Sequence, residues 1–196
     1  MRKISILLTI ILTFFVFNSQ AQRFGVKGGL NITNLKVTNE DFNAKLGMHI
    51  GPVAEFHFGD IFGLETGVLL TTKGGKNDDT DIKVNLTYLE FPVHARAGYD
   101  FGTTRVYGIL GPYFGFALGG KYKDGDTSTK IDFGDDGEPT RFDAGLSIGA
   151  CAAVSIFEIG FTYNHGLVDF GDWHEMKNRA FYLSVAYKFG KNPFKK

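Results

Sequence analysis

Apolar and polar residues alternate along residues 87–99, where Leu89 and Phe91 fall on one face and Glu90 and Arg96 on the other. A period of two residues is typical of a β-strand whose two faces meet different surroundings. The same period recurs along the chain and predicts an all-β protein. Eight strands are expected, at residues 24–31, 45–58, 62–72, 87–99, 105–118, 141–154, 157–165 and 179–189.

The connections between these strands alternate between long and short. Long connections are expected at residues 32–44, 73–82, 119–140 and 166–178, and short ones at 59–61, 100–104 and 155–156. Bacterial outer-membrane barrels have long loops outside the cell and short turns on the periplasmic side. This order favours an eight-stranded antiparallel up-and-down transmembrane β-barrel, with the N- and C-termini in the periplasm.

The polar face of the strands distinguishes this barrel from a soluble one, because a lipocalin-like periplasmic barrel with an apolar cavity has the same strand period. A soluble surface would be rich in Lys, Glu, Ser and Thr. Small residues instead suit the crowded interior of an eight-stranded barrel. The glycines on this face are Gly47, Gly51, Gly63, Gly67, Gly111, Gly115, Gly145 and Gly149. They predict that the polar face is enclosed and that the apolar face meets lipid.

Charged residues of both signs share the polar face with these glycines. Ions in a narrow interior are tolerated only when they are paired or hydrogen-bonded. One mixed polar network is therefore expected inside the barrel. Its members are Lys27, His49, Glu55, Glu65, Glu90, His94, Arg96, Asp143 and Glu158. The outward face carries no charge between its rims, as expected where a midplane Arg or Lys costs about 2 to 4 kcal/mol.

The first residues of the chain predict export. Arg2 and Lys3 precede an apolar run over residues 4–17, which is shorter than the roughly 20 residues that a spanning helix needs. Small residues follow it, so residues 1–21 are expected to form a cleaved signal peptide. The barrel is then expected over residues 22–190, with residues 191–196 as a short periplasmic tail.

Charge and cysteine content exclude several classes of protein. Without residues 1–21, the chain has 19 basic and 21 acidic residues, so net charge does not attract it to nucleic acid. Cys151 is the only cysteine, which excludes an internal disulfide. We expect no nucleic-acid partner and no cofactor.

No catalytic or metal site is expected either. Ser147, Ser184, His94 and Glu90 could supply a hydrolase, but no local motif joins them. Residues 124–128 echo the start of a calcium loop but lack its later glycine and glutamate. Side chains should fill so narrow a bore, so little porin activity is expected.

Several short segments give the chain a resemblance to a known family. They are residues 25–31, 88–92, 107, 111–113, 142–146 and 187–189. In this order they resemble the PorT-like outer-membrane β-barrel domain family. The resemblance implies an eight-stranded barrel in the outer membrane. The founding member takes part in protein secretion, a role that no residue here carries over.

The expected function is a non-enzymatic structural or interaction role, with the outer loops as a binding surface. The expected partners are outer-membrane lipid, the barrel-assembly machinery and an extracellular or periplasmic protein. Many such barrels end on a terminal aromatic residue that the assembly machinery reads, whereas seven residues follow Phe189 here. A part in secretion or transport across the outer membrane and a soluble lipocalin-like binder are the alternatives.

Overall fold

Strands make up most of the chain. The computed structural model describes residues 22–37, 40–41, 43–77, 82–125, 127–131, 133, 140–168 and 176–189, so the expected signal peptide and the tail lie outside the described residues. The strands are β1 (Gln22–Val37), β2 (Glu40–Asp41), β3 (Lys45–Phe58), β4 (Phe62–Gly67), β5 (Leu69–Asn77), β6 (Ile82–Phe101), β7 (Thr104–Asp124), β8 (Thr127–Ile131), β9 (Phe142–Val154), β10 (Phe157–Gly166) and β11 (Met176–Phe189). None of the described segments is a helix long and apolar enough to cross a membrane.

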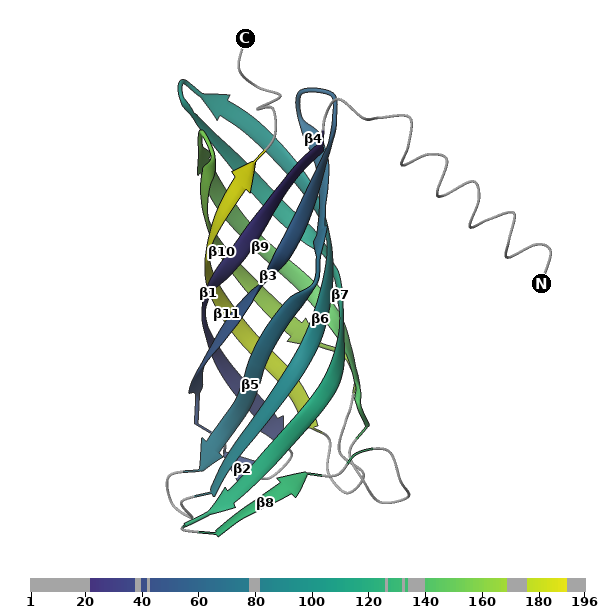
Figure 1. Ribbon diagram of the computed structural model, residues 1–196, viewed down its shortest axis with the longest axis vertical. Coiled ribbons are helices and arrows are strands. Elements are labelled where there is room, and N and C mark those ends of the chain that lie inside the picture. Colours follow the sequence, from purple (N-terminus) through teal and green to yellow (C-terminus); the bar gives the residue numbers. More distant parts are fainter. Residues whose placement is uncertain are drawn as a thin grey trace, which may run out of the picture.

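The strands close into a barrel in which all the pairings are antiparallel (Figure 1). β1 pairs with β3 on one side and with the last strand, β11, on the other. The ring continues through β10, β9, β7 and β6, and β4 and β5 together fill the place between β6 and β3. Closure pairs the backbone groups that an open sheet would leave exposed at its edges.

The described residues form eleven strands, where eight were expected from the sequence. One difference is a break at Val68, between β4 and β5. The register of the neighbouring strands places Pro52 opposite Val68 and Pro92 opposite Gly67. Proline has no N–H to donate to a ladder. The Val68 N–H still donates to the Pro52 carbonyl at 3.0 Å, but the ladder around Val68 is incomplete.

The other two differences are β2 and β8, which lie in the long connections expected at residues 32–44 and 119–140. β2 pairs with β1, and β8 pairs with β7. β5, β6 and β7 also continue past their expected ends, to Asn77, from Ile82 and to Asp124. The sheet therefore continues beyond the barrel on the side of the long connections. There its backbone groups form hydrogen bonds within the ladder, whereas those of a loop would bind water.

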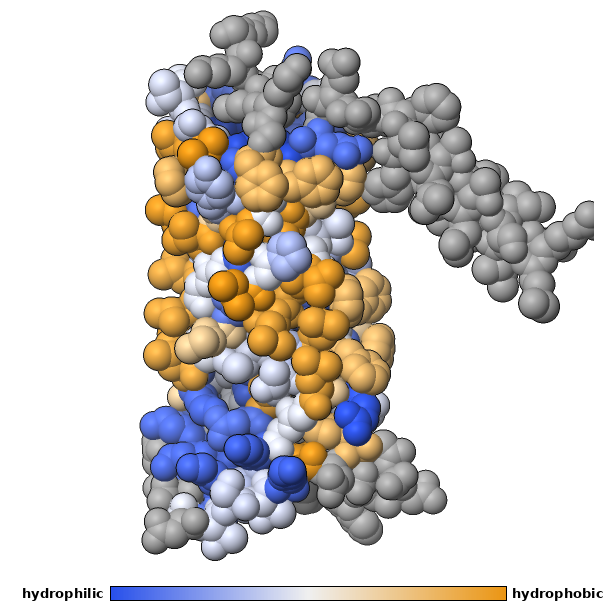
Figure 2. Space-filling model, in the orientation of Figure 1, coloured by the Kyte–Doolittle hydropathy of each residue, from blue (hydrophilic) through white to orange (hydrophobic). Residues whose placement is uncertain are grey.

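The two faces of the barrel wall differ in polarity. Outward side chains are apolar and exposed, as Ile148 (60%), Leu110 (59%) and Leu183 (55%) illustrate. Inward side chains such as Arg96 and Glu65 are buried, each 1% exposed. Figure 2 shows apolar residues gathered over the middle of one face of the molecule, with hydrophilic residues toward both ends. This arrangement is the opposite of that expected for a soluble lipocalin-like barrel.

The polarity reverses where the sheet rises above the barrel. We call this part the loop-side extension: residues 82–87 of β6, residues 119–124 of β7, and β8. Val84 and Leu86 are buried here against Phe133, while Lys121 and Lys130 are exposed. An irregularity in the pairing of β6 with β7, at Thr87/Tyr88, marks the junction. Above that point the outward face is suited to water and not to lipid.

Candidate functional site inside the barrel

The nine residues expected to form the polar network all lie on inward-facing positions of the wall. Eight of them are buried, with exposed fractions between 0% for Asp143 and 7% for His94. The side chain of Lys27 is 13% exposed. The alternation of faces places them there, because every second residue of a strand points to the same side. The single network expected from the sequence is not seen: seven of them lie in two separate ionic clusters along the barrel axis, and the two histidines lie apart from both.

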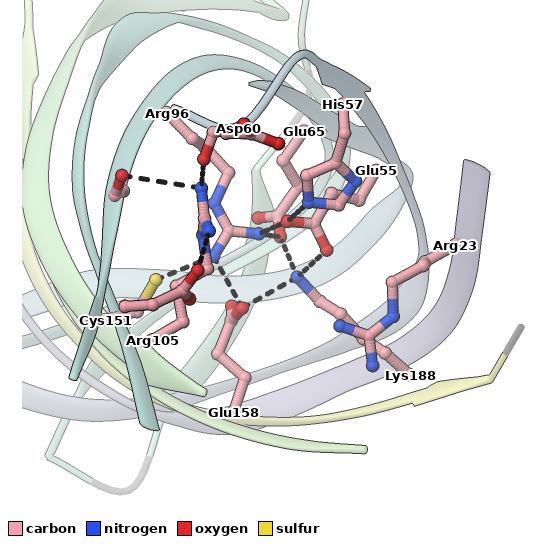
Figure 3. A network of polar contacts seen from close by, with 12 residues as sticks. Arg23, Glu55, His57, Asp60, Glu65, Arg96, Arg105, Cys151, Glu158 and Lys188 are labelled. Atoms are coloured by element: carbon pink, nitrogen blue, oxygen red, sulfur yellow. Dashed lines mark hydrogen bonds and ion pairs between the residues drawn. The ribbon is translucent and has the colours of Figure 1, made fainter. Parts of the chain in front are cut away.

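The first cluster lies toward the short turns, and we call it the turn-side cluster (Figure 3). Its members are Lys27, Glu55, His57, Glu65, Arg96, Glu158 and Lys188, with His57 Nε2 3.0 Å from Glu55 Oε1. Arg96 lies at its centre: Nη1 is 2.7 Å from Glu55 Oε1 and 3.0 Å from Glu65 Oε2. Its Nη2 is 2.5 Å from Glu158 Oε2. One guanidinium thus joins carboxylates from three strands.

Lys188 binds the same three carboxylates from the other side. Its Nζ lies 2.8 Å from Glu65 Oε2 and 2.8 Å from Glu158 Oε2. It is also 3.0 Å from Glu55 Oε2, and Lys27 pairs with Glu65 Oε1. Three cations therefore face three carboxylates, and this balance makes a buried ionic cluster tolerable.

Two further contacts fix the central guanidinium. Arg96 stacks on the ring of Tyr107, with 3.9 Å between Cζ and the ring centroid. Its Nη2 lies 2.8 Å from the sulfur of Cys151, which is buried. Stacking and hydrogen bonds on a planar group leave it little freedom to turn, so the cluster has one defined geometry.

Two arginines close the turn side of the interior by binding the turns themselves. Arg105 donates to the carbonyl of Asp60 and, at 2.9 Å, to Oδ2 of Asp100. Arg23 donates to the carbonyl of Ser155 at 2.9 Å. Turn carbonyls have no ladder partner, so these arginines supply it.

The second cluster lies toward the long connections, and we call it the loop-side cluster. It consists of Lys73, Glu90, Asp143, Asn164, Asn178 and Tyr182. Lys73 Nζ lies 2.7 Å from Glu90 Oε2 and 3.1 Å from Asp143 Oδ2. Its ammonium also lies 5.2 Å and 4.6 Å from the ring centroids of Tyr88 and Tyr113. These rings surround the cation with negative π faces.

Neutral donors also bind the two carboxylates of the loop-side cluster. Asn178 donates to Asp143 at 3.0 Å, and the Tyr182 hydroxyl donates to Glu90 at 3.2 Å. Asn164 donates to the other oxygen of Glu90 at 3.3 Å. The cluster thus pairs two carboxylates with one ammonium and relies on hydrogen bonds for the rest.

The two histidines of the expected network have separate surroundings. His49 Nε2 lies 2.9 Å from the hydroxyl of Ser184, and its ring meets the edge of Tyr182 at 5.0 Å between centroids. His94 lies opposite Glu65 across the β4–β6 pairing. Neither joins the ion pairs that define the two clusters.

Sequence reasoning missed two of the cations, Lys73 and Lys188. The sequence predicts that the preceding strand ends at residue 72, which places Lys73 in a connection, but Lys73 has the same parity as the buried Leu69 and Thr71. Lys188 lies on the polar side of the last expected strand, at residues 179–189, but is not among the expected network residues. Period two identifies Lys188 within that strand, and identifies Lys73 when it is carried one residue beyond the expected strand end.

The residues considered for hydrolysis are not arranged as a nucleophile, a base and an acid. Ser184 lies beside His49 and not beside His94, and Glu90 is bound by Lys73 and its neutral donors. Within the described residues, no group of three or more His, Cys, Asp or Glu could hold a metal ion. Part of the acidic connection at residues 119–140, including Asp126 and residues 134–139, lies outside the described part of the chain. The interior therefore has the geometry of a packed ionic core.

Comparison with solved structures finds similar folds. Neisserial surface protein A, from Neisseria, has 15% sequence identity and a TM-score of 0.55, over 85% of this chain and 97% of that chain. Ail, the attachment invasion locus protein of Yersinia pestis, has 17% identity and a TM-score of 0.49, over 87% and 99%. OprG of Pseudomonas aeruginosa has 13% identity and a TM-score of 0.49, over 88% and 98%.

Sequence comparison gives the family. Among curated proteins, no sequence matches this chain. The family model described as outer membrane protein beta-barrel domain matches residues 18–171, which is most of the sequence. With the closed sheet, the apolar belt and the enclosed charges, the match leads to one conclusion: the chain belongs to the outer membrane protein β-barrel domain family.

Proposed function

We propose that the protein is a non-enzymatic outer-membrane anchor whose loop side presents a binding surface to an extracellular partner. In this proposal the barrel wall has eight strand positions, one of which is shared by β4 and β5. The observation that carries it is the exposed apolar belt around buried, paired charges, as in Ile148 outside and Arg96 inside. Such a wall is stable in lipid and would aggregate in water.

The two ionic clusters favour an anchor over a conduit. Each joins side chains from several strands across the bore, at the turn side and at the loop side. A barrel with eight strand positions has room inside for little more than its own side chains. In planar bilayers we expect no large, stable conductance steps, and such steps would refute the plugged interior.

The proposed orientation places the short turns and both chain ends in the periplasm, after removal of residues 1–21. The extension formed by β6, β7 and β8 would then lie outside the cell. Long external loops and short periplasmic turns are the rule for bacterial barrels. The polarity reversal supports this orientation, because only one end of the described molecule carries a raised, water-suited sheet.

Cysteine labelling in intact cells tests this proposal. In a Cys151→Ala background, Asp124→Cys is placed in the extension and Thr103→Cys in a short turn; both positions are exposed. A membrane-impermeant maleimide should label Asp124→Cys in intact cells and Thr103→Cys only after the outer membrane is opened. The reverse result would invert the orientation, and labelling of a detergent-free periplasmic fraction would remove the membrane placement.

The resemblance to the PorT-like family supports a finer proposal, a part in secretion or transport across the outer membrane. Its support is the order of the short sequence segments, and the filled bore limits such a part to that of an accessory. A deletion strain that lacks exported cargo would favour this role over the anchor. The end of β11 at Phe189, which is exposed, supports recognition of that residue by the barrel-assembly machinery.

A further inference from the structure

A pocket of about 490 Å³ lies at the foot of the loop-side extension. β9 pairs with β7 as far as Phe116, and β8 pairs with β7 from Gly120 onward. The pocket is lined by the stretch of β7 between these two pairings, which includes Leu118, and by residues of β6 and β8. Small-molecule sites usually have volumes of roughly 300 to 1,000 Å³. The pocket is therefore large enough for a headgroup.

Three cations line this pocket: Lys121, Lys130 and Arg141. Lys121 and Lys130 are directly opposite each other on β7 and β8. Like charges at opposed positions of a sheet repel each other, and the pairing of β7 with β8 holds these two ammonium groups at opposed positions. No carboxylate is among the described residues that line the pocket. A bound anion would offset this repulsion.

The walls of the pocket are suited to an anion that carries apolar groups. Arg141 lies over the ring of Phe133, with 5.4 Å between Cζ and the ring centroid, which fixes the guanidinium at the pocket wall. Leu118, at the pocket's lower edge, is 52% exposed and continues the outward apolar face below, beside Phe116. An acyl chain could lie along this face while its headgroup occupies the pocket.

We propose that this pocket binds the phosphate group of a lipid headgroup in the outer leaflet. Arg141 and the two lysines supply charge-assisted hydrogen bonds to phosphate oxygens, which are among the strongest that proteins make. The position of the cations relative to the apolar surface agrees with this ligand. Lys121 lies three residues beyond the exposed Leu118 along β7, or roughly 10 Å of strand, so the charges lie just past the end of the apolar surface, where a lipid has its headgroup. This inference rests on the proposed orientation, which places the extension outside the cell.

The test is a titration of the purified barrel in neutral detergent with fluorescent diphosphoryl lipid A, read by anisotropy. Replacing all three pocket cations, by Lys121→Gln, Lys130→Gln and Arg141→Gln, should weaken binding by about tenfold or more. A matched variant, Lys83→Gln, Lys123→Gln and Lys177→Gln, removes the same charge outside the pocket and should weaken it by less than about threefold. If the triple pocket variant does not fold, Arg141→Gln alone replaces it.

Three results would overturn the proposal: equal losses in the two variants, equal binding of a dephosphorylated lipid A, or complete competition by inorganic pyrophosphate at the concentration of the lipid. The last result would identify a soluble anion as the ligand. The fold of the same samples is checked by the shift between heated and unheated protein on a gel, and the orientation is checked separately by the cysteine labelling in intact cells. A variant that keeps this shift and loses the lipid reports on the pocket alone.

Discussion

The barrel wall and the loop-side extension are parts of the same strands, yet they sort their residues in opposite ways. In the wall, apolar side chains such as Ile148 are exposed and charged ones such as Glu90 are buried. In the extension, Leu86 is buried and Lys121 is exposed. The difference shows that the surroundings outside the sheet decide which face is apolar, because a strand has no preference of its own.

β6 shows this difference most clearly, because the same alternate residues point inward along the whole strand. Leu86, Tyr88 and Glu90 are all buried, in an order that runs from apolar through aromatic to charged. Tyr88 therefore stands where the outside changes from water to lipid. Tyr88 itself faces inward and is fully buried, with the Lys73 ammonium 5.2 Å from its ring centroid.

The largest effect is expected from Arg96→Met, which leaves three buried carboxylates with less positive charge. Removing one partner of a buried ion pair costs about 3 to 5 kcal/mol. Urea unfolding in detergent micelles should show this loss in the free energy of unfolding. Lys123→Met, on the exposed face of the extension, is the control and should change that free energy by less than about 0.5 kcal/mol. Equal effects would mean that the interior cluster is hydrated.

A charge placed on the lipid-facing surface should give the next largest effect. Ile148→Lys lies near the middle of β9 and should cost about 2 to 4 kcal/mol, because lipid does not solvate the ammonium. Folding yield into phosphatidylcholine vesicles measures it. Thr127→Lys on β8 adds the same charge to the extension, opposite Asp124, and should fold as the parent does. Normal insertion of the Ile148→Lys variant would contradict the placement of the belt.

Leu86→Ala tests the small apolar core of the extension. Truncation of a buried leucine costs about 2 kcal/mol or more, and here the loss should remain local. Hydrogen exchange should speed up at the amides of residues 82–87 and 119–124. The unfolding midpoint of the wall should change little. A large shift of that midpoint would mean that the extension and the wall unfold as one unit.

The smallest effect is expected from Lys130→Glu, which turns the repulsion with Lys121 into attraction. Opposite charges at paired positions contribute roughly 0.2 to 1 kcal/mol relative to alanine. Protection of the β7–β8 amides should therefore increase slightly, while lipid A binding falls. A loss of protection would mean that these lysines are already neutralised by another group.

The sequence predicted the wall well because each wall residue meets either lipid or a crowded interior. The expected strands at residues 45–58, 141–154 and 157–165 end within a residue of β3, β9 and β10. Residues 119–124 and 127–131 of the extension fall within the connection expected at residues 119–140, and residues 83–86 lie between an expected connection and an expected strand. The break at Val68 was also missed, since it arises from prolines on two neighbouring strands that only the register brings together.

The sequence predicts which residues of the candidate site face the barrel interior, but not where each residue lies along the barrel axis. Alternation predicts Glu65 and Asp143 on the same inward side, and both side chains are buried in the structure. Which residues meet depends on the stagger between strands, which one sequence does not reveal. The inward cations Lys73 and Lys188 therefore had no assigned partners before the strands were placed.

The turn-side cluster has a consequence for how the barrel forms. Its charges come from β1, β3, β4, β6, β10 and β11, and β1 meets β11 only when the ring closes. Until then Lys188, on β11, is separated from Glu55 on β3 and Glu65 on β4, and those ions need water. Pairing the two ends of the sheet thus completes the ion pairs and expels the remaining water in one step. A partly formed, open barrel therefore has no stable state with a dehydrated interior.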